Sequence, residues 1–355
     1  VFIMKYKIGI WGQYGAPGQK IADGQAVRTT VVTRELENRY GKNNIGIANT
    51  NGWKKRPFAF LWESFRLIAD SDVVIIAPAD RGYKTFVPIL MFFNRFYHRK
   101  LVHLVIGGFL PTLLEQNPQY CGYEKKFDSI FVQTENIKKD LEKLGINNIH
   151  YLTNLKRLKK RNVDDIKLET NDDIKVCVFS RINKDKGVED AIAAVKIVNE
   201  RLGAQRVTLD FYGLLPESYK DRFNQLLEEN KGLIEYKGIV DYNTTVDVLS
   251  QYYVMLFPTY YHGEGFPGNV VDAYNSALPI IATDWLYNKD VIKNGRNGIL
   301  VPIQDPNAIA DALQYLYEHR EIRYEYAKNC LEDADQYKPD KVMAEFYQTM
   351  EEYWK

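Results

Sequence analysis

The chain alternates short apolar runs, rich in β-branched residues, with longer segments in which apolar residues recur every three or four positions. The short runs predict strands, and they are residues 6–12, 45–48, 72–78, 101–108, 129–134, 148–152, 174–180, 207–213, 233–238, 253–259, 279–283 and 298–301. The segments between them, such as 187–202 and 307–319, have the apolar spacing of helices. Near-continuous apolar strands separated by helices predict an α/β fold with parallel sheets covered on both faces.

This pattern stops and then restarts in the middle of the chain. Residues 155–173 are polar and charged, and a new strand opens at Ile174. A chain of 355 residues is also too long for one ordinary core. We therefore predict two doubly wound, Rossmann-like domains that face each other across a cleft. Their limits are 1–154 for the N-terminal domain, 155–173 for the linker, 174–335 for the C-terminal domain, and 336–355 for a helix that crosses back to the first domain.

Composition narrows the class of protein. A hydrophobic content of 45% with 26% charged residues is that of a globular protein. Lys and Arg exceed Asp and Glu by only one, which argues against a nucleic-acid partner. Any anionic partner must therefore bind to a local cluster of basic residues. The three cysteines are far apart, which predicts a reducing compartment without a disulfide or metal framework. With no apolar run near ~20 residues and no signal-peptide pattern, we expect a cytoplasmic protein.

The stretch "YHGEGFPGNVVDAYNSALPII" after the strand at 253–259 is the first candidate site. Gly263 and Gly265 flank Glu264 and present it without side-chain crowding. Pro267 suits the first turn of a helix, because its missing N–H has no helical partner there.

The start of that helix supplies further binding groups. Free amides around Gly268 and Asn269 are donors for phosphate oxygens or sugar hydroxyls. Asp272 follows one turn later as a second carboxylate. Alternatively Glu264 only caps the helix, but this does not account for the other residues of the stretch.

A second candidate follows the strand at 174–180. Arg181 lies just beyond this strand, and Lys186 precedes Gly187 and the next helix. A guanidinium fork and an ammonium group beside a helix start are suited to binding a diphosphate. The alternative is that "NKDKG" is a solvated turn with charges of both signs.

A glycine-rich loop follows the first strand. Gly12, Gly15 and Gly18 permit a tight backbone path before a helix that we expect from about Ala22, and the start of this helix would attract an anion. The loop is equally compatible with a simple tight turn. Its spacing differs from the G-x-G-x-x-G fingerprint, and no acidic residue follows in a ribose-binding position, which disfavours a nicotinamide dehydrogenase.

Taken together, these segments resemble family 4 of the GT-B glycosyltransferases, retaining enzymes that use nucleotide-activated sugars. The family signature is a Glu, a Gly-Phe pair and a second acidic residue eight positions after the first. "EGFPGNVVD" (264–272) matches it, with Asp in place of the usual Glu. The resemblance extends to "FSRINKDKG", "GLIEYKGIVDYNTTVDVLSQYYVMLFPTYY" and "ALPIIATDWLYNKDVIKNGRNGILV", and so covers most of residues 174–301. The first half matches mainly in architecture.

The resemblance implies a GT-B fold and a role for each site residue. Glu264 would hold hydroxyls of the donor hexose, Asp272 the ribose diol, and Arg181 and Lys186 the diphosphate. Other expected donor-binding residues are Gly15, Ile239, Val240 (the last two beside the base), His262, Gly265, Phe266, Pro267, Gly268 and Asn269. The donor would be a nucleotide-diphosphate sugar, with UDP favoured, and neither metal nor cofactor is expected.

Two departures from the family pattern affect this assignment. Asp272 is one methylene shorter than Glu, so its ribose contact is expected to be shifted or water-bridged. Many members carry a histidine at the end of a first-domain strand, but this chain has Gly107 and Gly108 there. We expect His103 to be a core residue and His262 to be the better candidate for a contact.

The acceptor of such enzymes normally binds the first domain. Residues 81–101 mix basic side chains with a dense aromatic and aliphatic stripe, which is typical of an amphipathic helix lying on anionic headgroups. Basic residues of "LKRLKKR" (155–161) would add to the same patch. We therefore expect a saccharide or lipid-linked acceptor and a peripheral location on the inner face of the membrane. The alternative is that Phe92, Phe93 and Phe96 pack on the sheet.

We interpret the chain as a retaining glycosyltransferase in surface polysaccharide or glycolipid assembly. A nucleotide-sugar epimerase of the same fold is one alternative, although it needs cleft histidines and the chain has five in all. A non-catalytic sugar-binding subunit of a transferase complex is another, and Glu264, Arg181 and Lys186 argue against it.

Overall fold

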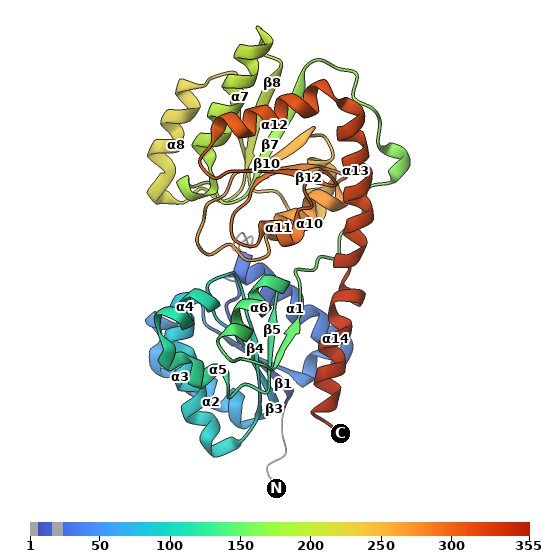
Figure 1. Cartoon of the computed structure of the whole chain (residues 1–355). Helices are drawn as coiled ribbons and strands as arrows, with labels where there is room; N and C mark the ends of the chain where they lie inside the picture. The colour runs from blue at the N-terminus through green and yellow to red at the C-terminus, as the bar shows by residue number, and fades with distance from the viewer. Residues whose placement is uncertain (1–5, 16–23) are drawn as a thin grey trace. The chain divides into compact units, whose positions relative to one another are not determined.

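The computed structural model describes residues 6–15 and 24–355, which form two compact units (Figure 1). The first unit comprises the residues up to Leu155 together with Pro339–Lys355, and the second comprises Lys156–Lys338. Gly18 and Ala22 of the predicted glycine-rich loop and helix start lie outside the described residues. Each unit contains one six-stranded parallel sheet with helices, so the predicted α/β class is confirmed.

The sheet of the first unit has the order β2-β1-β3-β4-β5-β6. Its strands are β1 (Tyr6–Gly12), β2 (Ile45–Asn49), β3 (Ser71–Ala77), β4 (Lys100–Leu104), β5 (Ser129–Val132) and β6 (Ile149–Tyr151). All six were predicted, but the run at 101–108 is too long, because β4 ends at Leu104. Beyond this point Gly107 adopts a φ of 80°, and its N–H donates to Gln133 Oε1 at 2.9 Å, so the chain turns instead of continuing the strand.

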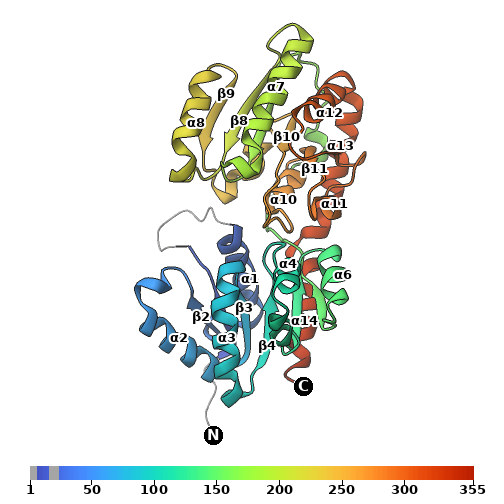
Figure 2. The same cartoon turned by 60° about the vertical axis from the view of Figure 1, so that its left-hand side comes forward.

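Helices cover both faces of this sheet. They are α1 (Gly24–Tyr40), α2 (Pro57–Ala69), α3 (Asp80–Tyr97), α4 (Leu110–Gln116), α5 (Cys121–Glu124), α6 (Glu135–Lys143) and α14 (Pro339–Glu352). One face of the sheet packs against α1 and α14, and Phe346 of α14 lies with its ring centroid 4.5 Å from that of Phe131 on β5. On the other face α2 and α3 lie side by side, and both contact Trp11 of β1 through Phe60 and Phe86 (Figure 2).

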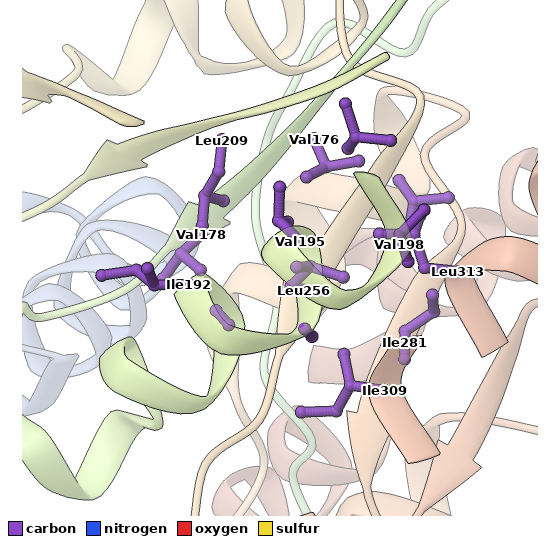
Figure 3. Packing of buried hydrophobic residues seen from close by; sticks show 14 of the residues in the cluster. Val176, Val178, Ile192, Val195, Val198, Leu209, Leu256, Ile281, Ile309 and Leu313 are labelled. Carbon is purple, nitrogen blue, oxygen red and sulfur yellow. The ribbon is translucent and has the colours of Figure 1, made fainter. Parts of the chain in front are cut away.

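The sheet of the second unit has the order β12-β11-β10-β7-β8-β9. Its strands are β7 (Ile174–Phe179), β8 (Val207–Tyr212), β9 (Ile234–Gly238), β10 (Val254–Phe257), β11 (Ile280–Thr283) and β12 (Gly298–Val301). Its helices are α7 (Val188–Leu202), α8 (Glu217–Glu229), α9 (Thr245–Leu249), α10 (Gly268–Asn275), α11 (Asn288–Val291), α12 (Pro306–Glu318) and α13 (Arg320–Ala334). Figure 3 shows one core of this unit, in which Val195 of α7 and Leu313 of α12 pack among strand residues such as Val176.

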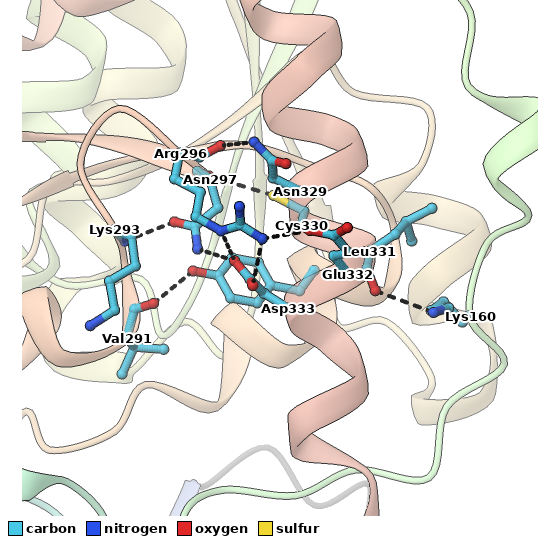
Figure 4. A network of polar contacts seen from close by, with 11 residues as sticks. Lys160, Val291, Lys293, Arg296, Asn297, Asn329, Cys330, Leu331, Glu332 and Asp333 are labelled. Carbon is cyan, nitrogen blue, oxygen red and sulfur yellow. Dashed lines mark hydrogen bonds and ion pairs between the residues drawn. The ribbon is translucent and has the colours of Figure 1, made fainter.

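Polar contacts fix the turn before β12 to helix α13 (Figure 4). The buried side chain of Asn297 accepts a hydrogen bond from Lys293 N and donates one to Asp333 Oδ2, both at 2.8 Å. Arg296 pairs with Asp333 and Glu332 in the same network. These bonds satisfy the polar groups of the turn where it passes over the helix.

Residues 156–173, the greater part of the segment predicted as a linker, pack on the second unit. Arg161 N donates to Asn275 O at 2.9 Å, and Ile166 is buried against Ala277 and Leu331. The segment contains no strand, and a single 3₁₀ turn spans Val163–Asp165. It therefore forms a strap across one side of this unit.

Candidate functional site

The strand order of the second unit places its binding edge beside β7. From β7 the chain runs to β8 and β9 on one side, while β10, β11 and β12 lie on the other. The strand order therefore reverses direction between β7 and β10. In parallel α/β sheets, ligands bind outside the carboxyl ends of the strands at the point of such a reversal. The loops after β7 and β10 meet at this position, and they carry the predicted basic pair and the predicted carboxylate.

Gly187 brings these two loops into contact. It has a φ of 72°, and a Cβ atom placed on it would lie 2.1 Å from Pro258 O, so no larger residue fits without displacing backbone. Tyr260 N also donates to Asp185 O at 2.9 Å, which joins the same loops by a main-chain hydrogen bond. Lys186 is thereby held beside the chain that follows β10.

Lys186 and Glu264 form an ion pair at this edge. Lys186 Nζ contacts Glu264 Oε2, which also accepts a hydrogen bond from Thr259 Oγ1 at 2.9 Å. The ammonium group lies 4.9 Å from the centroid of the Tyr261 ring, a cation–π distance. The structure thus brings together the predicted Lys186 and Glu264, and Glu264 does not serve merely as a helix cap.

Arg181 lies in the loop after β7, two residues beyond Phe179, and its side chain is half-buried. Asn269 Nδ2 donates to Phe179 O at 2.8 Å, which fixes the start of α10 against the end of β7. Arg181, Lys186 and the start of α10 therefore surround the same strand end. A guanidinium group, an ammonium group and free helix amides at one strand end are suited to a diphosphate.

Helix α10 starts one residue later than predicted. Pro267 immediately precedes the helix, and Gly268 is its first residue. Phe266 is buried and packs edge-on against Tyr337 with 5.1 Å between the ring centroids, so it anchors the loop that contains Gly265 and Glu264. The N–H groups of the first helical turn have no acceptor within the helix itself, which leaves those of Gly268 and Asn269 to an external anion.

Asp272 is buried within this helix and pairs with a residue that the sequence did not suggest. Its side-chain Oδ2 contacts Lys156 Nζ, at the start of the second unit. Burial raises the pKa of the Asp272 carboxyl above its ordinary value, and Lys156 acts in the opposite direction. The second oxygen, Oδ1, is buried and accepts no hydrogen bond from the described residues.

Asn269 presents a second acceptor of the same kind. Its Oδ1 is buried and likewise lacks a hydrogen-bond partner in the described part of the chain. Residues three positions apart lie on one side of a helix, so Asn269 and Asp272 share a face of α10. Two unsatisfied oxygen acceptors on one buried face are a costly arrangement that a ligand hydroxyl would relieve.

The remaining predicted residues lie at the margins of this site or outside it. His262 is exposed, and its ring lies 5.5 Å from that of Trp285, which donates to Tyr261 O at 2.9 Å. Ile239 and Val240 follow β9, with Ile239 exposed. Gly15 belongs to the first unit, in the loop after β1.

Two predictions about basic and histidine residues have clear outcomes. His103 is a core residue as predicted: it is fully buried, and Nδ1 lies 3.0 Å from Glu124 Oε2. The expectation that segment 155–161 adds to a basic membrane patch is wrong for Lys156 and Lys160. Lys156 is paired with Asp272, and Lys160 donates to Leu331 O and pairs with Asp335.

The sequence reasoning missed Lys156, Thr259 and Tyr261. Thr259 and Tyr261 lie inside the quoted stretches after β10, so their proximity to Glu264 was a usable signal. Lys156 had no such signal, because 116 positions separate it from Asp272. Within the ranges that the structure describes, no cluster of three or more His, Cys, Asp or Glu is arranged to hold a metal ion.

Comparisons of sequence find a family match that lies within the second unit. Residues 173–319 match the glycosyl transferases group 1 family. The chain is similar to the capsular polysaccharide biosynthesis glycosyltransferase CapM of Staphylococcus aureus, with 27% identity over 174 residues, 47% of this chain and 44% of CapM. It is also similar to the putative glycosyltransferase EpsD of Bacillus subtilis, with 24% identity over 151 residues, 42% of this chain and 38% of EpsD. The match spans less than half the length of these curated relatives.

Comparisons of structure extend to the whole chain. HepE of Anabaena, solved in complex with UDP and glucose, has a TM-score of 0.75 at 14% identity and covers 98% of this chain and 99% of its own. Sucrose-phosphate synthase of Thermosynechococcus elongatus also has a TM-score of 0.75 at 14% identity, with 99% of each chain covered. The second unit therefore carries a glycosyl transferases group 1 domain, and the chain as a whole has the fold of the GT-B glycosyltransferases.

Proposed function

We propose that this chain is a retaining glycosyltransferase of family 4. It transfers a hexose from a UDP-sugar to a saccharide or lipid-linked acceptor in the assembly of a surface polysaccharide or glycolipid. The relatives CapM and EpsD support the reaction class, and HepE, solved with UDP and glucose, supports UDP as the nucleotide. The site geometry supports an assignment of each donor group to residues of the second unit.

The diphosphate of the donor binds at the end of β7. Arg181 offers a planar fork for two phosphate oxygens, Lys186 offers a point charge, and the first amides of α10 offer neutral donors. When the bond between the anomeric carbon and the phosphate oxygen breaks, the electron pair stays on the diphosphate. The same cations then stabilise the added charge of the leaving group, which is where prepositioned donors accelerate a reaction.

The ribose diol binds at Asp272 and Asn269, and one observation carries this part of the proposal. Asp272 Oδ1 is a buried acceptor that the described residues leave without a donor, while Oδ2 is held by Lys156. A ribose hydroxyl is a donor of the right kind for this oxygen. Lys156 fixes the carboxylate so that the shorter Asp side chain still directs one oxygen to the ligand.

The hexose binds at Glu264. Its carboxylate is positioned by Lys186 and Thr259, and carboxylate oxygens accept hydrogen bonds from two adjacent sugar hydroxyls. His262 and Trp285 flank the same loop and supply further contacts to the sugar. The reaction needs no cofactor besides the donor, because Arg181 and Lys186 supply the positive charge.

The test is incubation of the purified chain with a panel of UDP-, GDP- and ADP-sugars, each with and without a saccharide acceptor, with products followed by NMR. The proposal predicts release of the free nucleotide diphosphate and a sugar product that keeps the anomeric configuration of the donor. Conversion of the nucleotide sugar to an epimer without acceptor would instead identify an epimerase. Absence of turnover by the chain, combined with tight binding of the donor, would identify a sugar-binding subunit.

A further inference from the structure

Trp285, in the loop after β11, is fixed to the turn that presents Glu264. Its indole N–H donates to Tyr261 O at 2.9 Å, and Glu264 N donates to the same oxygen at 3.1 Å. His262 packs against the indole ring at an angle of 70°, with 5.5 Å between the ring centroids. The tryptophan is only half-buried, so part of its ring remains open to a ligand. One carbonyl oxygen therefore holds both this ring and the residue that supplies the carboxylate of the proposed hexose site.

A second connection joins the loops that follow β10 and β11. Thr283 Oγ1 donates to Thr259 O, and Thr259 Oγ1 in turn donates to Glu264 Oε2 at 2.9 Å. Glu264 is thus tied to the loop after β11 through its side chain as well as through its main chain. The position of Trp285 relative to the carboxylate is therefore set by two separate sets of hydrogen bonds.

The loop after β11 has a strained main-chain conformation. Leu286 has a φ of 45°, in the left-handed region that a bulky side chain rarely adopts, and its side chain is 36% exposed. The fully buried Asn288 holds the loop in this shape, because its Nδ2 donates to Thr283 O and its main-chain N–H to Trp285 O, both at 3.0 Å. Strain of this kind persists only where the surroundings fix it, and it is concentrated at ligand-binding sites.

The order of the strands places Trp285 at the end of the hexose site that is remote from the diphosphate. Strands β7, β10 and β11 are neighbours in the sheet, and the loops after them carry Lys186, Glu264 and Trp285 in that order. Neighbouring strands lie about 4.8 Å apart, so β7 and β11 are separated by about 10 Å. With the diphosphate at the end of β7, the hexose would extend past Glu264 toward the indole ring. In a pyranose, C4 lies across the ring from the anomeric carbon, so the C4 side of the sugar would meet Trp285.

We infer that Trp285 is the residue that selects among donor sugars at C4. An aromatic ring beside a carboxylate suits a hexose, because the aromatic ring covers C–H groups while the carboxylate accepts hydrogen bonds from hydroxyls. A change from an equatorial to an axial hydroxyl at C4 alters whether a C–H or an O–H group lies against the ring. The inference rests on the proposed function, since it assigns sugar selection to one residue of the proposed hexose site.

A role in holding the turn alone is the alternative. In that case the indole N–H would only fix the turn between Tyr261 and Glu264, and loss of this donor would weaken the binding of all sugars equally. The two roles can be separated, because Trp285→Phe keeps an aromatic ring at this position but cannot donate a hydrogen bond to Tyr261 O.

The test is calorimetric binding to the full chain of UDP, of UDP-glucose and UDP-galactose, and of UDP-N-acetylglucosamine and UDP-N-acetylgalactosamine. Within each pair the sugars differ only in configuration at C4. In the pair that binds more tightly, the wild type should prefer one epimer by about tenfold or more. Trp285→Ala should reduce this preference to about twofold or less, while the affinity for UDP alone stays within about twofold of the wild type. Trp285→Phe should retain most of the preference.

Matched control residues are exposed aromatic side chains of the first unit. Trp62 of α2 is 61% exposed, and Phe92 and Phe96 of α3 are 56% and 69% exposed. The alternative in which Phe92 and Phe96 pack on the sheet is therefore wrong. Trp62→Ala removes the same side chain as Trp285→Ala but from outside the donor site, so it should bind UDP and both epimers as the wild type does. Equal melting temperatures of the unliganded proteins would show that the variants are folded.

Three results would overturn the inference. They are a wild type that does not distinguish the C4 epimers, a Trp285→Ala variant that keeps the wild-type preference, and a Trp285→Phe variant that loses the preference as fully as Trp285→Ala. Any of these together with normal UDP binding leaves the proposed donor site intact. A wild type that does not bind UDP would instead refute the proposed donor site, and the inference with it.

Discussion

Lys186 and Glu264 are 78 positions apart in the chain and form an ion pair at the end of the central strand of the second unit. The pair is largely shielded from solvent, with 13% of the lysine side chain and 9% of the glutamate side chain exposed. It holds one group proposed to bind the leaving diphosphate against one proposed to bind the transferred sugar. The two groups are therefore positioned relative to each other before a donor arrives, which reduces the reorganisation that binding requires.

Glu264→Ala should lower kcat/KM by well over tenfold, because the proposed sugar contact is lost. The free enzyme should remain folded, since the site is at the edge of the sheet. Glu228→Ala removes an exposed glutamate of α8 and should leave kcat/KM unchanged. Sugar transfer by Glu264→Ala at the wild-type rate would refute the role given to this carboxylate.

Gly187→Ala should disrupt the site by moving the loop after β7 away from Pro258. The added methyl group meets a backbone oxygen that cannot yield easily, so we expect a loss of about 2 kcal/mol or more in the free energy of unfolding, together with weaker donor binding.

Gly203→Ala is the matched control for this substitution. Gly203 has a similar φ of 66°, but among the described residues nothing lies within 4 Å of an added Cβ, so only the backbone strain of about 1 kcal/mol should appear. Equal losses for the two variants would show that close contact with Pro258 is unimportant.

Asp272→Asn should make the ligand-free protein more stable at neutral pH while weakening nucleotide binding. The pKa of Asp272 is raised in the folded state, so the folded protein holds a proton at pH values where the unfolded chain has lost it. The contribution of Asp272 to the free energy of unfolding therefore falls as the pH rises from the ordinary pKa of about 4 through the raised value. Asn mimics the protonated form of Asp272, so the variant does not lose this free energy of unfolding as the pH rises.

Chemical denaturation of the wild type and Asp272→Asn across pH 3 to 8 tests this prediction. The difference in free energy of unfolding between the variant and the wild type should vanish at the acid end of this range and grow toward neutral pH. Asp221→Asn, an exposed position on α8, should show no such trend. A variant less stable than the wild type at every pH would mean that the contact with Lys156 outweighs the cost of burial.

Arg28 should be important for the stability of the first unit. This buried residue of α1 donates from Nη1 to Thr153 O at 2.9 Å and to Asn154 Oδ1 at 2.8 Å, and from Nη2 to Leu152 O. These bonds fix the main chain just before it enters the second unit.

Arg28→Met removes these three hydrogen bonds, and we expect a loss of about 3 kcal/mol in the free energy of unfolding. Arg34→Met, at an exposed position of the same helix, should change it by about 0.5 kcal/mol or less. Similar losses in the free energy of unfolding for both variants would show that the hydrogen bonds of Arg28 do not stabilise the first unit.

The fold could be predicted because most strands are near-continuous apolar runs that are buried on both faces, although the edge strand β9 is partly exposed. The overrun at 101–108 arose because "LVHLVIGG" stays apolar where Gly107 already turns the chain. Glu264 and Lys186 could be predicted because each directly follows a strand at the same edge of the sheet. The contact between Lys156 and Asp272 could not be predicted, since it depends on how the strap of residues 156–173 crosses the second unit. Periodicity likewise could not decide whether Phe92 and Phe96 face the sheet or solvent, because both arrangements place aromatic residues on a helix.

The most direct test of the donor site is the affinity of UDP measured by calorimetry for the wild type, Lys186→Ala and Lys184→Ala. Both lysines belong to the same loop, but Lys184 is exposed and Lys186 pairs with Glu264. We predict that Lys186→Ala weakens UDP binding by about tenfold or more, while Lys184→Ala leaves it within about twofold of the wild type. UDP binding that is equally strong in all three proteins, or absent from the wild type, would contradict the assignment of the diphosphate to this strand end.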